Sequence, residues 1–484
     1  MRIGGLATGM DIDNLVNKLM SAERIPLDKM EQERTTLEWK RDAFREVNTK
    51  LSELEALMFD MKLSPTYNAK TVSSSHEDAV IATASTSTAN GTYQINVKEL
   101  ATNAINVSAE EIDASAISAG QEITFSTVDE NGEANEYTYT VEEGETLTEV
   151  LKRVSADDNN VRMFYDEQTN KVIMETSRTG NYNERGAEIQ FTANSFFSSV
   201  LKMNMDNEKG GTNAKFEYNN SGLEMESKTN AYSLNGINFE FKNTTNDSNA
   251  TLTVINDVEG SFQSIMKFVD KYNEVVEALN SSQKEEKYRD YPPLTEEQKK
   301  EMSDKEIELW EEKAKSGLLR GESTISSGLF DLRQSWYSNV DTGGEYNSIT
   351  QVGMKTSSNY LDGGKLIVDE QELKKALREN PADVQKLFSN NEEGASRGII
   401  HRLDDALSTT IGRIGEKAGS TGQTLENYSL GKRMKDLNTR ISDFENRLVQ
   451  VESRYWNQFT AMEKAISRMN QQSAQLMSQF GSGM

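Results

Sequence analysis

The feature that most constrains the fold is a long apolar stripe near the C-terminus. Between Lys432 and Phe480 the chain has no glycine and no proline, the residues that most often interrupt a helix. Apolar side chains recur there at steps of three and four residues, at Met434, Leu437, Ile441, Phe444, Leu448, Val451 and Tyr455. Such a helix is roughly 49 residues and about 70 Å long. We expect a partner helix to cover the stripe; an ordinary long core helix is the alternative.

The step of this stripe changes near Tyr455. Two consecutive steps of four follow Val451, and such a stutter locally unwinds a left-handed coiled coil. The stripe then continues at Phe459, Met462, Ile466, Met469, Leu476 and Phe480. We expect these last turns to dock on another molecule and to be frayed without it. The alternative is that they pack back on Leu15 and Leu19 of the same chain.

The N-terminal end carries a matching pattern. Asp11 or Asp13 is a candidate N-cap, Pro26 is expected to restart the helix, and Ser64-Pro65 to end it. One heptad row comprises Met30, Leu37, Phe44, Leu51 and Met58, and a second comprises Val47, Leu54 and Met61. We therefore predict a coiled coil between the two ends, with a seam formed by Leu37, Phe44, Val47, Leu51, Leu54, Ile441, Phe444, Leu448, Val451 and Tyr455.

The middle of the chain is typical of β-structure. Alternating or β-branched runs bounded by Asn, Gly, Asp or Ser predict strands at 92–100, 123–125, 137–141, 172–174, 189–191, 234–241 and 250–254. Asn131-Gly132 predicts a hairpin turn. Between Ala104 and Gln190 the sequence has 19 acidic and 6 basic residues, a balance of −13. We expect this acidic part to be the outermost and well solvated.

Helical periodicity returns after the β-region, at 262–279, 295–315, 318–337 and 370–388. Thr295 and Gln298 are spaced for a capping box, and Pro381 is expected to break the last of these helices. The fold class predicted is α+β multidomain, with terminal helices in a coiled-coil or helical bundle and two nested β-rich domains. The predicted domains are a terminal leg (1–45 with 445–484), a helical domain (46–70 with 258–444), a β-rich domain (71–103 with 225–257) and an outer acidic β-rich domain (104–224).

Charge and composition exclude several classes of function. The formal net charge is −25, from 78 acidic and 53 basic residues, which disfavours nucleic-acid and anionic-membrane partners. There is no cysteine, so disulfides, thiolate zinc sites and cysteine nucleophiles are excluded. No apolar run is long enough to span a bilayer. Residues 1–20 lack the continuous apolar core of a secretory signal, so cleavable export is not expected.

Catalytic and metal motifs give no positive signal. The two histidines, His76 and His401, lie in unlike contexts. Gly4 to Gly9 has the spacing of a phosphate loop, but Met10 stands where a lysine is required. The run from Asp129 to Gly132 has its glycine at the fourth position, whereas a calcium loop requires it at the sixth. We therefore expect no enzyme activity, no cofactor and no metal site, although counting carboxylate pairs alone does not exclude a glycoside hydrolase.

Several segments together resemble the flagellar hook-associated protein 2 family of bacterial filament caps. The opening Gly-Gly-Leu-Ala-Thr-Gly-Met-Asp-Ile-Asp at 4–13 carries much of the likeness. Further similar segments are Glu23–Leu27, Trp39–Asn48, Gly91–Val97, Phe268–Asn273, Trp310–Arg320 and Asn380–Phe388. These segments are distributed along nearly the whole chain apart from its acidic β-region.

The resemblance implies a structural protein at the distal end of the bacterial flagellar filament. Such caps form a homo-oligomeric ring that promotes the ordered insertion of secreted flagellin. The implied partners are other copies of the chain, flagellin, a hook-associated junction protein, and an export chaperone on the stripe from Met462 to Phe480. The resemblance also implies an extracellular location after flagellar type III export, with Gly4 to Gly9 in the uncleaved signal. The alternatives are a hook–filament junction protein, a flagellin-like axial subunit, or an adhesin acting through the outer β-domain.

Overall fold

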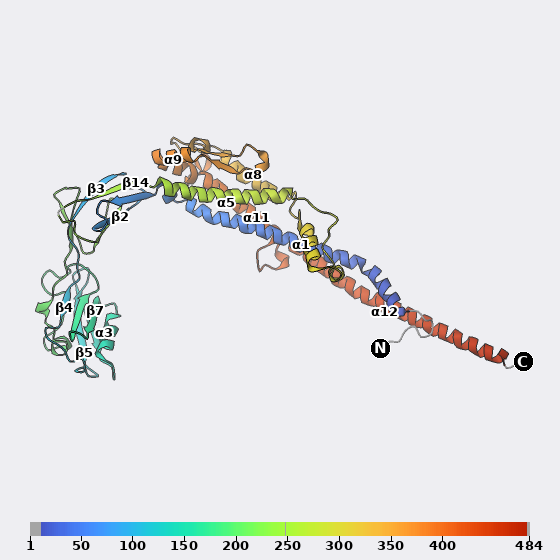
Figure 1. Ribbon diagram of the computed structural model, residues 1–484, viewed down its shortest axis with the longest axis horizontal. Coiled ribbons are helices and arrows are strands. Elements are labelled where there is room, and N and C mark those ends of the chain that lie inside the picture. The colour runs from blue at the N-terminus through green and yellow to red at the C-terminus, as the bar shows by residue number, and fades with distance from the viewer. Residues whose placement is uncertain (1–10, 247, 482–484) are drawn as a thin grey trace. The chain divides into compact units, whose positions relative to one another are not determined.

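The chain forms two compact units in the computed structural model, which describes residues 11–246 and 248–481, without the side chains of 478–481. The helical unit comprises Met1–Tyr67 with Phe262–Met484, and the β-unit comprises Asn68–Ser261. Along the sequence, helices at the two ends of the chain flank a β-rich middle, as Figure 1 shows by colour. The predicted α+β class is confirmed.

The first helix of the helical unit, α1, runs without interruption over Ile12–Met61. Asp11 is its N-cap, because its Oδ1 accepts a hydrogen bond of 3.0 Å from the backbone N–H of Asn14. The expected restart at Pro26 is wrong, since this proline lies inside the helix. Val16 and Leu27 are buried on either side of it, and packing of this kind outweighs a single lost backbone hydrogen bond.

The remaining helices of this unit pack around α1 and around one another. An aromatic cluster lies at their core, where Tyr272 contacts Trp336 at a centroid distance of 5.4 Å and Tyr67 stacks on Phe388 at 5.6 Å. The main helices are α2 (Pro65–Asn68), α5 (Val258–Lys284), α8 (Ser323–Tyr337), α9 (Glu370–Glu379), α10 (Pro381–Ser389), α11 (Ile399–Ala418) and α12 (Ser429–Gly481). A two-stranded sheet joins β15 (Met354–Thr356) to β16 (Leu366–Val368). The predicted break at Pro381 is confirmed.

Residues 285–322, which join α5 to α8, form what we call the α6–α7 projection. It contains α6 (Glu296–Lys300) and α7 (Asp304–Lys315), neither of which has a buried residue. The predicted capping box at Thr295 is present, but the single helix expected over 295–315 is wrong. Ser303 starts a new helix there, because its backbone N–H donates to Glu306 Oε2 at 2.9 Å.

The β-unit contains a pair of sheets with one core. The five-stranded sheet has the order β1-β14-β3-β10-β11, and the three-stranded sheet has the order β12-β13-β2, with antiparallel pairing throughout. Their bounds are β1 Lys70–Ser74, β2 Val80–Ala84, β3 Gly91–Glu99, β10 Ala214–Tyr218, β11 Glu224–Ser227, β12 Ala231–Leu234, β13 Ile237–Phe241 and β14 Ala250–Asn256. Tyr93, Ile95 and Val97 alternate inward from β3 and are buried with Phe216 and Phe239. The alternation predicted for 92–100 is thus confirmed.

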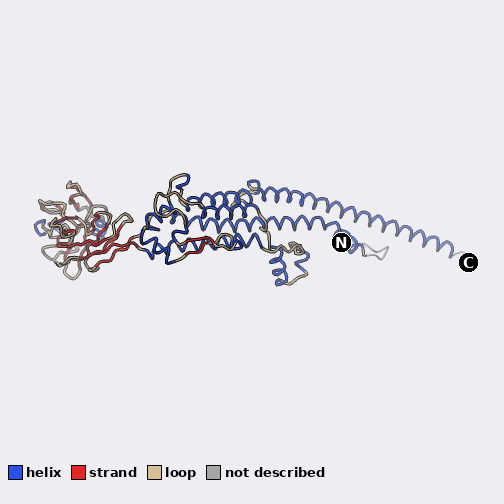
Figure 2. The backbone as a smooth tube through the Cα atoms, turned by 90° about the horizontal axis from the view of Figure 1, so that it is seen from above, coloured by secondary structure: helices blue, strands red, loops and turns tan. Residues whose placement is uncertain are grey.

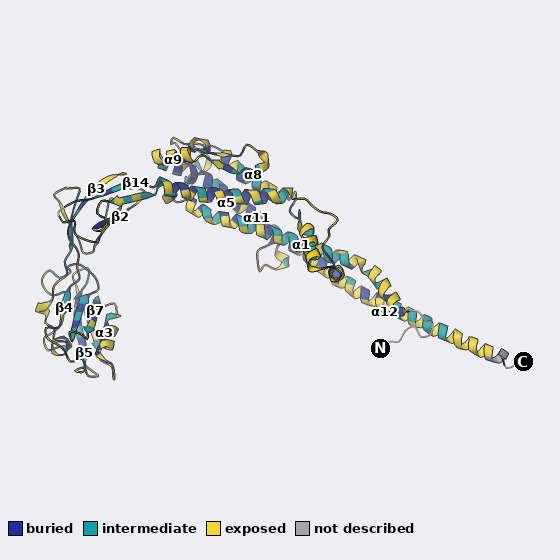
Figure 3. Ribbon diagram, viewed as in Figure 1, coloured by how far each residue is buried: buried dark blue, intermediate teal, exposed yellow. Residues whose placement is uncertain are grey.

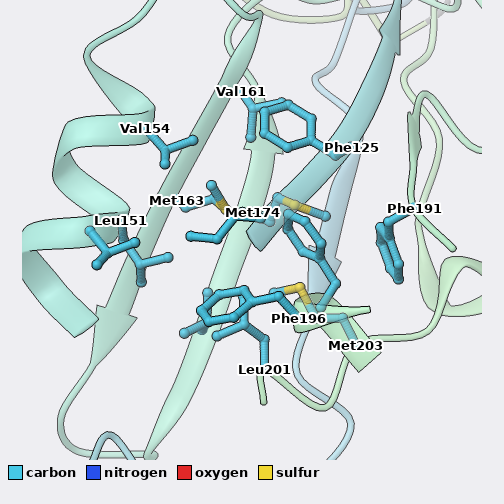
Figure 4. Packing of buried hydrophobic residues seen from close by; sticks show 14 of the residues in the cluster. Phe125, Leu151, Val154, Val161, Met163, Met174, Phe191, Phe196, Leu201 and Met203 are labelled. Atoms are coloured by element: carbon cyan, nitrogen blue, oxygen red, sulfur yellow. The ribbon is translucent and has the colours of Figure 1, made fainter. Parts of the chain in front are cut away.

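A second hydrophobic core is formed by the elements from β4 to α4, which precede β10 in the sequence. Its sheets are β4-β8-β7 and β6-β5-β9, covered by short helices. The elements are β4 Ile105–Val107, β5 Glu122–Val128, β6 Ala134–Thr140, α3 Leu147–Ser155, β7 Val161–Asp166, β8 Lys171–Thr176, β9 Ile189–Gln190 and α4 Phe196–Ser199. Leu151 and Val154 of α3 pack toward Phe125 and Met174 (Figure 4). The hairpin predicted at Asn131-Gly132 is confirmed, since Asp129 N–H donates to Glu133 O at 2.8 Å between β5 and β6.

The chain enters and leaves this second core at one place. Thr102 N–H donates to Thr212 O at 3.0 Å, and the two threonine hydroxyls lie 3.0 Å apart.

The four-part domain division stays a prediction. Its boundaries at 45/46, 444/445 and 224/225 fall inside α1, α12 and β11, respectively.

Candidate functional site

The candidate site is the pair of terminal helices α1 and α12. The two run antiparallel, because Arg433 near the start of α12 lies 3.8 Å from Glu33, whereas Tyr455 further along donates a hydrogen bond of 2.9 Å to Glu23 Oε1. Figure 2 shows the two helices side by side. The structure therefore brings together segments more than 400 residues apart in the sequence. Periodicity alone predicts that each stripe needs a partner helix, but it does not identify that partner.

The predicted seam residues are mostly buried. Phe444 and Tyr455 are half-buried, and the fully buried ones are Leu37, Phe44, Val47, Leu51, Leu54, Ile441, Leu448 and Val451. Their partners are not all those expected. The later half of α1 lies along α11, because Lys417 sits 4.9 Å above the ring of Phe44 and Ser408 donates to Glu55 at 3.0 Å. The assembly role of the seam stays a prediction.

The predicted terminal stripe loses its cover along α12. Phe459, Met462 and Ile466 are half-buried, whereas Met469 is 59 % exposed and Leu476 is 54 % exposed. Figure 3 shows this change as the helix passes the end of α1. The side chain of Phe480 and the whole of Gly4 to Gly9 lie outside the described residues. The sequence reasoning missed Met477, which is 75 % exposed and adds to the same apolar end.

Packing of the stripe back on Leu15 and Leu19 is not what the structure shows. Each of these two leucines is 38 % exposed, and the buried residues at this end of α1 are Ile12 and Val16. The exposed stripe of α12 therefore has no apolar cover in the part of the chain that the structure describes. Exposed apolar surface of this kind is typical of a docking site.

A charged cluster ties the pair to the rest of the helical unit. Glu322, whose side chain is 14 % exposed, forms ion pairs with Lys40 of α1 and Lys417 of α11. Burial raises the pKa of the Glu322 carboxyl, but the two ammonium groups outweigh burial and hold that pKa below its usual value. Nearby, the guanidinium of Arg45 donates to the carbonyls of Ala418 and Gly419 at 3.1 and 3.2 Å. These contacts tie α1 to the C-terminal end of α11.

The described residues include a cavity beside α1 and one histidine with a shifted pKa. A cavity of about 520 Å³ lies between α1, α5 and the α6–α7 projection, with Trp39, Val47 and Leu319 in its wall. Burial lowers the pKa of His401, and the charges of Lys62 and Arg397 lower it further. Among residues 11–246 and 248–481 no cluster of three potential ligands is arranged to hold a metal ion. No helix within these ranges has the length and apolar character needed to cross a membrane.

Comparisons with known proteins agree along nearly the whole chain. Residues 8–104 match the model for the flagellar hook-associated protein 2 N-terminus, and residues 211–471 match that for its C-terminus. Flagellar hook-associated protein 2 of Halalkalibacterium halodurans is 36 % identical, covering 99 % of this chain and 100 % of the relative. The A-type flagellar hook-associated protein 2 of Pseudomonas aeruginosa is 25 % identical, covering 98 % and 96 %.

A comparison with solved structures shows the same fold. The crystal structure of the D1-D2-D3 domains of the flagellar cap protein FliD from Escherichia coli superposes with a TM-score of 0.59, covering 82 % of this chain and 99 % of that chain. Its sequence identity is 18 %, so the likeness concerns the fold alone. Neither family model matches the sequence between 104 and 211, and this part of the chain forms the second core of the β-unit.

Proposed function

The chain belongs to the flagellar hook-associated protein 2 family, and we propose on this basis that it caps the distal end of the flagellar filament. In this role, copies of the chain form a ring at the tip and promote the ordered insertion of secreted flagellin. The observation that carries the proposal is the agreement with the family at both ends of the chain, over 8–104 and 211–471. The role is structural and requires no catalytic group.

The exposed end of α12 supports a role in assembly. Met469, Leu476 and Met477 are each more than half exposed on a helix that continues to Gly481. Leaving such side chains in water is unfavourable, at about 25 cal/mol per Å² of apolar surface that a partner does not bury. We propose that flagellin, the hook-associated junction protein or a neighbouring copy covers this end in the filament. An export chaperone covers it beforehand.

Export through the flagellar type III channel is part of the same proposal. The absence of cysteine supports passage of an unfolded chain, since no disulfide has to be reduced. The glycine-rich segment Gly4 to Gly9 would form part of the uncleaved export signal. After export the protein would lie outside the cell at the filament tip.

Deletion of the gene in the source bacterium tests the capping role. We expect the deleted strain to secrete monomeric flagellin into the medium and to bear no filaments, and the wild-type chain to restore them. Electron microscopy of cells and immunoblots of the medium give the two readouts. Normal filaments in the deleted strain would overturn the proposal.

A pair of variants in that strain tests the exposed end of α12. Met469→Gln with Leu476→Gln removes apolar surface at positions where the helix has no cover, and we expect flagellin to leak. The matched control is Gln471→Ala with Gln472→Ala, which alters two exposed polar residues of the same turns. Equal leakage from both variants would mean that the apolar stripe has no special role in capping.

A further inference from the structure

A regular row of arginines on α12 flanks the buried seam. Arg433, Arg440, Arg447 and Arg454 follow one another at intervals of seven residues, and all four are exposed. Seven residues are nearly two turns, so the four side chains lie along one side of the helix, about 10.5 Å apart. Arg433 reaches Glu33 at 3.8 Å. Within the described ranges, Arg440, Arg447 and Arg454 form no ion pair with a carboxylate.

A complementary row lies on α7 of the α6–α7 projection. Asp304, Glu308 and Glu312 are spaced by four residues, which places them on one side of the helix over about 12 Å. All three are exposed, and none forms an ion pair among the residues that the structure describes. Leu309, which follows Glu308, is 52 % exposed. This helix therefore presents carboxylates and an apolar side chain outward.

The projection contacts α1 at two places, near Pro293 and at the C-terminal end of α7. Gln32 of α1 donates to the carbonyl of Pro293 at 2.7 Å, and the indole N–H of Trp310 donates to the carbonyl of Pro292 at 2.8 Å. At its C-terminal end, the ammonium of Lys315 lies 4.8 Å above the ring of Trp39. Trp310 holds α7 on the side opposite Glu308, whereas Lys315, seven residues after Glu308, lies at the end of the carboxylate row and reaches α1.

The two rows lie at a similar level along α1 but on different sides of it. Gln32 holds the projection and Glu33 pairs with Arg433, so neighbouring residues of α1 mark the level of both surfaces. Figure 2 shows α12 on one side of α1 and the helical projection, yellow in Figure 1, on the other. The backbone of α7 is therefore separated from the α12 of its own chain by α1.

We propose that α7 of one copy docks on the arginine row of α12 in the next copy. The contact is head-to-tail, because each copy uses a different surface toward its two neighbours, and repetition of such a contact generates a ring or a helical array. Glu308 and Glu312, about 6 Å apart along α7, bind Arg440 and Arg447, about 10.5 Å apart along α12. The long arginine side chains converge on the two carboxylates, and their stems cover Leu309. This inference rests on the proposed function, in which copies assemble at the filament tip, and identifies the surfaces that join them.

Charge makes this local match important. Each copy has a formal net charge of −25, so two copies repel at long range unless opposite charges meet at their contact. A basic row on so acidic a molecule supplies the missing attraction and fixes the register of the two helices. Guanidinium groups suit the task, since they bind carboxylates in a bidentate geometry.

Charge exchange in the full-length chain tests the contact. Arg440→Glu with Arg447→Glu should weaken self-association at least about tenfold in analytical ultracentrifugation, because attractive pairs become repulsive. Glu308→Arg with Glu312→Arg should weaken it similarly. Mixing the two double variants should restore assembly, since in an alternating array every contact then pairs opposite charges.

The matched control is Lys355→Glu with Lys375→Glu. Both lysines are exposed, and this variant has the same net charge as the arginine variant. It should assemble like the wild-type chain, and melting curves should show that all variants remain folded. If both charge-reversal variants self-associate as strongly as the wild-type chain, this interface is overturned, while the capping role stays intact.

Two other results would also be decisive. A wild-type chain that stays monomeric at every concentration would overturn both the interface and the self-assembling ring. Loss of binding to flagellin with unchanged self-association would show that the arginine row serves flagellin, and would overturn the proposed copy-to-copy contact.

Discussion

Substituting Leu448 by Asp tests the packing of α12 on α1. Leu448 is 9 % exposed, so about nine-tenths of its side chain leaves water on folding. Truncation of a buried leucine to alanine costs about 2–5 kcal/mol. The seam is flanked by solvent, which favours the lower half of this range, but an unpaired carboxylate adds at least ~1 kcal/mol. We expect a loss of about 3–4 kcal/mol in the free energy of unfolding.

The neighbouring residue provides the control. Val449 lies on the same helix turn but is 66 % exposed, so Val449→Asp should cost about 0.5 kcal/mol or less. Thermal unfolding followed by far-ultraviolet circular dichroism should show a midpoint about 5–10 °C lower for Leu448→Asp, and less than about 2 °C lower for the control. Equal midpoints for the two variants would refute the assignment of the buried seam.

Three further predictions concern the stability of the parts. Removing residues 466–484 should leave the thermal midpoint within about 2 °C of the full chain, because Met469, Leu476 and Met477 are exposed; a clear drop would show that this segment packs within the monomer. Replacing 103–211 by a short glycine–serine linker should preserve the sheet of β1, β14, β3 and β10, because Thr102 and Thr212 are hydrogen-bonded neighbours at 3.0 Å; loss of cooperative unfolding would contradict this. The pKa of Glu322 is lowered, so its ion pairs stabilise the fold above about pH 4.5 and lose that contribution as the pH falls through the folded-state pKa. Glu322→Gln should therefore flatten the fall in unfolding free energy between about pH 5 and pH 3, and an unchanged slope would refute the role of the cluster.

The sequence contains enough information for the long helices and the simple turns. The heptad rows identify α1 and α12, and Asn131-Gly132 identifies the hairpin of β5 and β6, because both patterns are local. Pro26 shows the limit of such rules. Its ring disfavours a helix interior, but the burial of Val16 and Leu27 on each side maintains the helix.

Partner choice is the part that local pattern does not determine. Phe44 belongs to a heptad row and must be covered, but nothing in that row distinguishes α11 from α12 as its cover. Helix α3 has no counterpart among the predicted elements, although its sequence carries a local signal. Thr146 and Glu149 form a capping box at its start, and its apolar side is formed by Leu147, Val150, Leu151 and Val154. Its local signal was present, but the surrounding strands favoured a purely β interpretation of the region.

The antiparallel pairing of the two ends also has a consequence for the timing of folding. Glu23 and Tyr455 are 432 residues apart, and a bacterial ribosome adds about 5–20 residues per second. Helix α1 therefore emerges about 20–90 s before its partner has been synthesised, whereas the β-unit is complete much earlier. Contacts of such long sequence separation form late. The part of the apolar face of α1 that α12 covers thus stays unpaired until the end of translation, which keeps the nascent chain open to a holding factor and delays closure of the helical unit until the last residues are released.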